Sequence, residues 1–187
     1  QEYPGAQMKV LETDSAGAVE QILSRRADIG FAGTVLEEKQ CIYIPFYQDE
    51  LVVIIPGEGL EGPESAAETA AWIRRMPVIL REEGSGTRKE AQRLLRQMGI
   101  ELSELNIVAS IQNQETIKRS VRNGMGISIL SRLAAEDEIR SGVLRAVPLG
   151  ETGGKRNSNL VFDRRSLHST EAEKLIDLVK EMYPDNV

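Results

Sequence analysis

The sequence is poor in the residues on which disulfide frameworks, histidine-dependent catalysis and aromatic surfaces depend. Among 187 residues there are one cysteine, one histidine and 4% aromatic side chains. Cys41 has no partner for an internal disulfide, and we expect it to be a small buried side chain at the start of a strand. His168 would have to supply the imidazole of any Ser-His-Asp site, which argues against that class of enzyme.

The sequence also lacks an excess of basic charge and a long apolar run. Its net charge is −6 and its pI is near 5.0, whereas a nucleic-acid surface needs clustered lysine and arginine. Apolar runs such as LVVIIP fall far short of the roughly 20 residues that span a bilayer, and no signal segment opens the chain. We therefore expect a cytoplasmic protein that contacts no membrane and that does not bind DNA through this chain.

What the sequence does contain is an alternation of short apolar runs with amphipathic ones. The predicted strands are MKVLE, DIGFAG, CIYIPF, ELVVIIP, PVIL, NIVAS, GISIL and LVFDRR. Helical spacing of apolar residues follows several of them, and Thr87 with Glu90 is typical of a capping box. CIYIPF and ELVVIIP are almost continuous, as when a polypeptide crosses from one lobe to another. This alternation predicts an α/β architecture with largely parallel sheets.

Enzyme motifs are incomplete wherever they can be tested. Ser85 lies in EGSGT, which lacks both outer glycines of the G-x-S-x-G nucleophile elbow. GETGGKR has too short a spacing for a phosphate-binding loop, and Arg156 replaces its Ser or Thr. GMGISI has Ile129 where a dinucleotide-binding fingerprint needs Gly or Ala. We expect no catalytic residue, no metal ligand and no cofactor.

The stretch REEGSGTR, residues 81–88, is the main candidate for a binding site. It follows the apolar run PVIL and precedes an amphipathic run, which predicts a turn at a helix N-terminus. The first turn of a helix has unpaired backbone N–H groups and a partial positive charge, and it can hold an anion. The same hydroxyl residues could instead only cap the helix. Arg81 and Arg88 could add charge-assisted contacts, although Glu82 and Glu83 oppose them.

Several stretches together resemble a known family. QEYPGAQMKV, ADIGFAG, IPFYQDELVVIIP, REEGSGTRKEAQ and QETIKRSVRNGMGISILSRLAAEDEIRSGVLRAVPL are similar, in that order, to the effector-binding domain of LysR-type transcriptional regulators. REEGSGTR looks most like the branch of regulators of sulfite reduction and cysteine synthesis. The resemblance implies a type 2 periplasmic-binding-protein fold, with two α/β lobes joined by two crossing strands. It places lobe I at about residues 1–48 and 166–187, and lobe II at about residues 49–165.

The sequence departs from the family pattern in two ways. The family begins with a winged helix-turn-helix and a linker helix, and neither is in this sequence. YPG usually follows a first strand and helix of lobe I, so the resemblance implies that this βα unit is absent from the chain. It also implies that DNA is bound only through the missing N-terminal domain and that the full-length protein is a homodimer or homotetramer.

Candidate effector contacts follow from the position of loops after strands. In open α/β lobes, ligands sit beyond the carboxyl ends of the strands. Related cysteine-pathway regulators use a hydroxyl residue at the position of Ser85, and a residue at or beside Thr34, for their effector. For each candidate the alternative is local, a helix cap or a strand end. The candidate ligand-binding residues are Ser85, Gly86, Thr87, Gln112, Asn113, Thr34, Gly33 and Ser15.

Together these features favour an effector-sensing domain that binds a small anionic or amino-acid-like metabolite in the cleft between its lobes without transforming it. The alternative is a free-standing solute-binding protein of the same fold, which the lack of a signal segment disfavours. An enzyme built on this fold is a further alternative, which the single histidine and the incomplete motifs disfavour.

Overall fold

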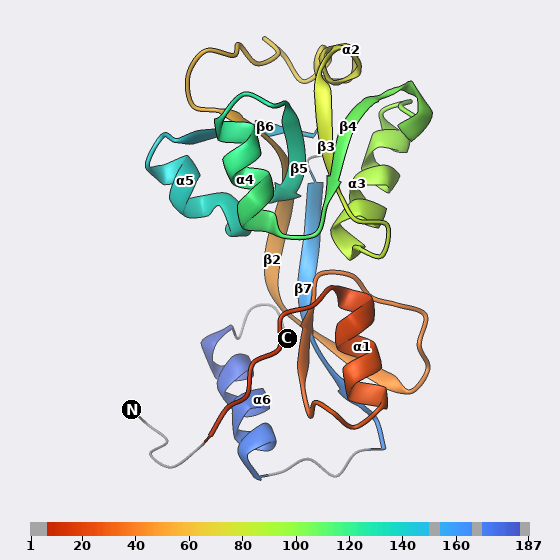
Figure 1. The fold of residues 1–187 in the computed structure, drawn as a ribbon. Coiled ribbons are helices and arrows are strands. Elements are labelled where there is room, and N and C mark those ends of the chain that lie inside the picture. The colour runs from red at the N-terminus through yellow and green to blue at the C-terminus, as the bar shows by residue number, and fades with distance from the viewer. Residues whose placement is uncertain (1–6, 150–153, 166–169, 184–187) are drawn as a thin grey trace. The chain divides into compact units, whose positions relative to one another are not determined.

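The computed structural model describes residues 7–149, 154–165 and 170–183. The chain divides into unit 1, residues 1–48 and 157–187, and unit 2, residues 49–156. It passes between them within two strands, β2 (Cys41–Pro56) and β7 (Gly154–Asp163) (Figure 1). The expected boundary after residue 165 differs from this division, because Leu160 and Val161 of β7 pack into the cores of unit 1.

Unit 2 contains a mixed sheet. β3 (Pro77–Arg81) is parallel to both β4 (Asn106–Ile111) and β5 (Ile127–Ser131). β2 is antiparallel to β5 and to β6 (Leu144–Pro148). The parallel pairs are those joined by helices. The expectation of largely parallel sheets is wrong for this unit, because β2 pairs in the antiparallel sense with both β5 and β6. The antiparallel pairs involve the strand by which the chain enters the unit.

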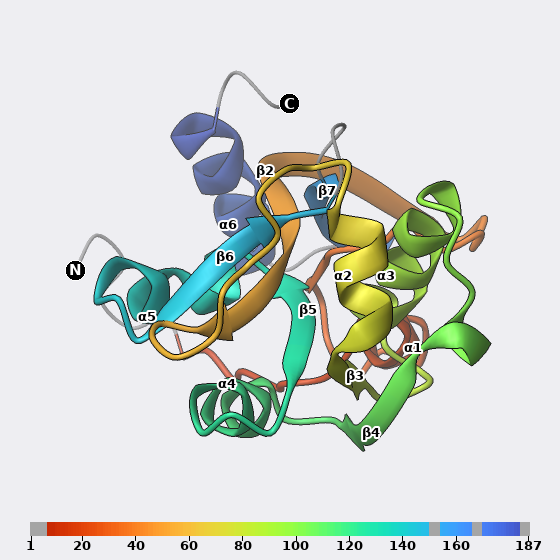
Figure 2. The same ribbon diagram turned by 90° about the horizontal axis from the view of Figure 1, so that it is seen from above.

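Helices cover both faces of this sheet. Figure 2 shows α4 (Gln114–Arg122) on one side of β3 and β5, and α2 (Thr69–Arg75) with α3 (Gly86–Gln97) on the other. The strands are therefore buried on both faces, and alternate residues of β2 serve different cores. Val53 packs with α2 and α3, whereas Ile54 packs with α4. The short elements η1 (Leu102–Glu104), η2 (Leu133–Ala135) and α5 (Glu136–Arg140) complete the unit.

Unit 1 contains α1 (Ser15–Leu23), β1 (Gly30–Ala32), the adjoining parts of β2 and β7, and α6 (Thr170–Met182). β1 is antiparallel to β7. Cys41 is the first residue of β2 and is buried with Val19 and Ile22 of α1, which confirms its expected place. Burial, followed by the negative charges of Glu38 and Asp163, raises the pKa of its thiol.

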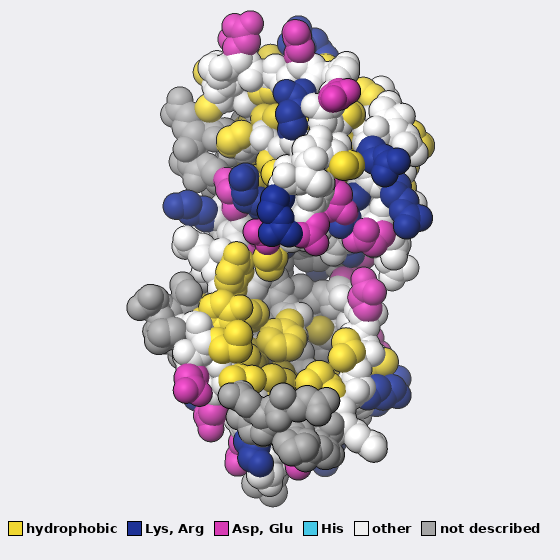
Figure 3. Space-filling model, turned by 90° about the vertical axis from the view of Figure 1, so that its left-hand side faces the viewer, with side chains coloured by type: hydrophobic (Ala, Val, Ile, Leu, Met, Phe, Trp, Pro, Cys, Tyr) yellow, Lys and Arg dark blue, Asp and Glu magenta, His cyan; other side chains and the backbone are white. Residues whose placement is uncertain are grey.

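One of the strands expected in unit 1 is not formed. MKVLE is not a strand, because it has no partner strand among the described residues and its backbone groups are left without a ladder. Its side chains are exposed, with Met8 at 74% and Val10 at 79%, and Figure 3 shows apolar side chains gathered on one face of this unit. His168 of unit 1 lies outside the described residues, as do residues 150–153 of GETGGKR in unit 2.

Candidate functional site

The parallel pairing of β3 and β4 brings two predicted binding segments to one edge of the sheet. Arg81, the last residue of β3, is paired in register with Ile111, the last residue of β4. The loop that leads into α3 therefore begins beside the loop that contains Gln112 and Asn113 (Figure 1). This is the edge at which open α/β sheets bind ligands.

Ser85 is the N-cap of α3. Its Oγ accepts a hydrogen bond from the backbone N–H of Arg88 at 3.4 Å. The expected capping box of Thr87 and Glu90 is therefore wrong, because the helix begins at Gly86 and Glu90 forms an ion pair with Arg93 at 2.6 Å. The N–H groups of Gly86 and Thr87 belong to the first turn, where no intrahelical acceptor exists.

The cap at Ser85 is longer than the caps that begin α1 and α4. Asp14 accepts from the N–H of Gly17 at 2.7 Å at the start of α1, and Asn113 accepts from the N–H of Thr116 at 2.9 Å at the start of α4. A separation of 3.4 Å lies beyond the usual range for an N–H···O bond, so the hydroxyl of Ser85 contributes little as a cap. The side chain is 1% exposed, and its proton is not used in this bond.

The two arginines of REEGSGTR are neutralised locally. Arg81 is 8% exposed and forms a two-pronged ion pair with Glu82 at 2.9 and 3.0 Å. Arg88 donates through Nη1 to the carbonyl of Arg81 at 3.0 Å and to the hydroxyl of Ser110 at 3.2 Å, and it lies 3.9 Å from Glu83. The N-terminus of α3 adds its partial positive charge at this edge.

A buried ion pair that the motif analysis missed adjoins the same turn. Arg156 donates through Nε to Oδ2 of Asp49 at 3.0 Å, and its Nη2 lies 3.0 Å from the same oxygen in an ion pair. Its Nη1 donates to Oγ1 of Thr87 at 3.3 Å. The side chains of Arg156 and Asp49 are 11% and 3% exposed. The signal available in the sequence was the acidic pair Asp49 and Glu50 inside the apolar run IPFYQDELVVIIP.

The candidates in unit 1 have the positions expected of loop and cap residues. Ser15 is the first residue of α1, after the cap Asp14. Gly33 and Thr34 follow β1, and Oγ1 of Thr34 is buried with no hydrogen-bond partner in the described part of the chain. The two units are described separately, so the prediction that these residues serve the same effector as Ser85 stays a prediction.

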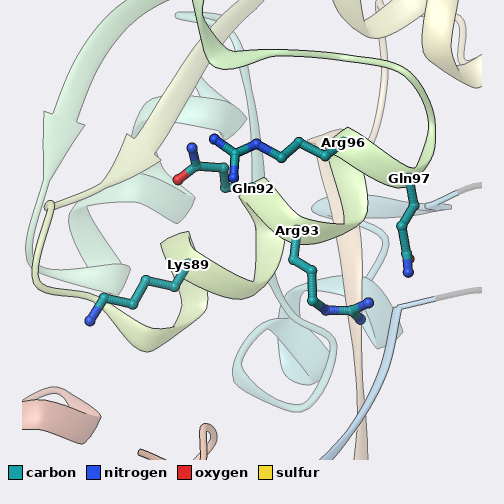
Figure 4. A pocket seen from close by; sticks show the side chains of 5 residues that line it. All are labelled: Lys89, Gln92, Arg93, Arg96 and Gln97. Atoms are coloured by element: carbon teal, nitrogen blue, oxygen red, sulfur yellow. The ribbon is translucent and has the colours of Figure 1, made fainter.

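A shallow surface hollow lies elsewhere on α3 and contains none of the candidate residues. Figure 4 shows that its side chains extend from the helix in several directions and do not converge. Arg93 is paired with Glu90, and Arg96 with Glu101 at 3.1 Å. The hollow is lined by Lys89, Gln92, Arg93, Arg96 and Gln97.

Neither a metal centre nor a membrane span is found in the described ranges. They contain no group of three or more His, Cys, Asp and Glu residues able to hold a metal ion. No helix within the same ranges is long and apolar enough to cross a bilayer.

Comparison with known proteins gives a single family, described as "LysR substrate binding domain", which matches residues 1–184. The relatives include the "Uncharacterized HTH-type transcriptional regulator YeiE" of Escherichia coli (strain K12), 37% identical over 79% of this chain and 50% of that protein. The "HTH-type transcriptional regulator CysL" of Bacillus subtilis is 25% identical over 97% of this chain and 59% of CysL. The match to CysL is consistent with the resemblance to the cysteine-pathway branch.

A third relative has a different name. The "Phosphonates import ATP-binding protein PhnC" of Anaeromyxobacter dehalogenans is 29% identical over 97% of this chain but only 36% of that protein. The chain thus spans between about a third and three fifths of the curated relatives described.

A solved structure has the same fold. The regulatory domain of Synechocystis CcmR, determined in complex with 2-PG, aligns with a TM-score of 0.82 at 22% identity, over 98% of this chain and 86% of that one. At this identity the likeness shows the fold, which is the expected type 2 periplasmic-binding architecture of LysR effector domains.

Proposed function

Because the chain belongs to the LysR substrate binding domain family, we propose that it is the effector-sensing domain of a transcriptional regulator and that it binds a small anion at the N-terminus of α3. Control of DNA would then require a segment other than this acidic chain. We also propose that the full-length regulator acts in the cytoplasm as a homodimer or homotetramer. The solute-binding alternative has less support, because YeiE and CysL are both named as regulators.

The proposal rests on the hydrogen-bond donors in the first turn of α3. The N–H groups of Gly86 and Thr87 have no intrahelical acceptor, and the hydroxyl of Ser85 is held by a long cap of 3.4 Å. The nearby arginines are already paired with carboxylates, so an anion would be held by directed N–H and O–H donors. Such donors suit a carboxylate or an oxyanion.

The effect of Ser85→Ala separates binding from capping. If Ser85 donates to the effector, its loss removes one hydrogen bond to an anion and weakens affinity on the order of tenfold. Because the cap is long, the melting temperature should change by only about 1–2 °C. Ser141→Ala is the matched control, since that hydroxyl bonds to the carbonyl of Asp137 at the end of α5.

The measurement is calorimetric titration of the 187-residue chain with sulfate, phosphate, acetate and 2-PG, together with thermal melts. We expect at least one probe to bind wild type and the Ser141→Ala chain equally, and the Ser85→Ala chain more weakly. If a probe binds all three chains alike while Ser85→Ala melts several degrees lower, Ser85 is a cap and the proposed site is wrong.

A further inference from the structure

In the contact between Arg156 and Thr87, chemistry fixes which atom donates the hydrogen bond and which accepts it. A guanidinium has only donors, so Oγ1 of Thr87 must accept from Nη1 of Arg156. The hydroxyl proton of Thr87 is then free to donate, and no acceptor for it is recorded within the described ranges. The hydroxyl of Ser110 differs, because it accepts from Arg88 and donates to the carbonyl of Arg81 at 3.3 Å.

Asp49 holds the guanidinium in the orientation that this contact requires. Nε of Arg156 donates to Oδ2 of Asp49 at 3.0 Å, and Nη2 of Arg156 lies 3.0 Å from the same oxygen. The side chains of Arg156 and Asp49 are 11% and 3% exposed, so the pair is largely shielded from water. The ion pair therefore joins β2 and β7 to the first turn of α3.

We infer that Arg156 is a positioning residue that makes Thr87 a hydrogen-bond donor, and that it thereby selects effectors that present a hydrogen-bond acceptor to Thr87. The inference rests on the proposed function, since it concerns the same turn. An ionised carboxylate or sulfate oxygen satisfies such a donor, whereas an ammonium group facing Thr87 leaves two donors opposed. Arg156 need not touch the effector to have this effect.

Lysine at position 156 is the informative substitution. Lysine keeps the charge but lacks the planar fork, so it cannot bind Asp49 and Thr87 in the same geometry. We expect Arg156→Lys to weaken sulfate binding on the order of fivefold to tenfold. Arg74→Lys, at an exposed pair with Glu104, is the matched control and should leave sulfate affinity unchanged.

A double-mutant cycle tests whether Arg156 acts through Thr87. Thr87→Val removes the hydroxyl, and Thr87→Ser keeps it and should retain affinity. If the inference holds, Arg156→Lys has almost no further effect on sulfate affinity in the Thr87→Val background. Equal effects of Arg156→Lys in both backgrounds, or an effect on melting temperature alone, would overturn it.

Failure of the inference is distinguishable from failure of the proposed function. If Ser85→Ala and Thr87→Val weaken binding but Arg156→Lys does not, the site stands and the role of Arg156 is refuted. If wild type binds none of the probes, or if Ser85→Ala and Thr87→Val leave affinity unchanged, the proposed site is refuted and the inference with it.

Discussion

Lys118 provides the sharpest test of the packing of unit 2. It lies on the inner face of α4 and is 7% exposed. Its ammonium contacts Glu115 at 2.7 Å, Glu138 at 2.9 Å and the carbonyl of Ala134 at 3.0 Å. Three acceptors therefore satisfy the three donors of a lysine that would otherwise be costly to bury.

Lys118→Met should destabilise the chain by leaving Glu138 without its counterion. Glu138 is 26% exposed and its Oε2 is already buried without a partner, so solvent can compensate only in part. We expect the free energy of unfolding to fall by about 2–3 kcal/mol, which is less than the ~3–5 kcal/mol lost when one partner of a fully buried ion pair is removed. In a chain of this size that corresponds to a drop in melting temperature of roughly 5–10 °C.

Two comparison variants isolate the cause. Glu115 is 63% exposed, so Glu115→Gln should cost less than about 1 kcal/mol. Adding Glu138→Leu to Lys118→Met removes the unpaired charge and should restore most of the lost stability. Urea unfolding followed by circular dichroism measures all four chains. The reasoning is refuted if the double variant is as unstable as Lys118→Met, or if Lys118→Met behaves like Glu115→Gln.

The difference in stability between wild type and Lys118→Met should depend on pH in a defined direction. Burial acts to raise the pKa of Glu138, but the hydrogen bond from Lys118, a backbone hydrogen bond and the charge of Lys118 together outweigh it, and the pKa is lowered. For Lys118, burial acts to lower the pKa, but the bonds to Glu115 and Glu138 outweigh it and the pKa is raised. The stabilisation that ionised Glu138 contributes is therefore complete above the ordinary carboxyl pKa. It is lost as the pH falls through the lowered pKa of Glu138. The difference in free energy of unfolding between wild type and Lys118→Met should therefore become smaller below about pH 4.

Two further predictions concern single residues. Gly126 has φ of +155°, and a Cβ there would lie 2.4 Å from the carbonyl oxygen of Pro77, so Gly126→Ala should lower the melting temperature by several degrees, whereas Gly59→Ala, at an open position, should cost less. Cys41 should react slowly with a thiol reagent in the native state and rapidly in urea, because its thiol is buried and its pKa is raised. Equal rates in the two states would contradict the packing of Cys41 against α1.

Periodicity and local chemistry were sufficient to predict most of the regular structure. The helical spacing after REEGSGTR and in QETIKRSVRN corresponds to α3 and α4, and Gly124, with φ of +77°, ends α4 as expected. The near-continuous run from CIYIPF to ELVVIIP is the single strand β2. These features depend on side chains within one or two turns of each other, so the sequence by itself determined them.

Other features depend on contacts between residues far apart in the chain. MKVLE has the pattern of a strand but no partner strand among the described residues, and a strand requires one. The choice of Ser85 rather than Thr87 as N-cap depends on where β3 ends and delivers the chain. The pairing of Asp49 with Arg156, and the contact of Arg156 with Thr87, join three segments that no motif connects. Only the tertiary structure decided them, because the burial that makes a lone charge costly, and so dictates its partner, exists only once the chain has folded.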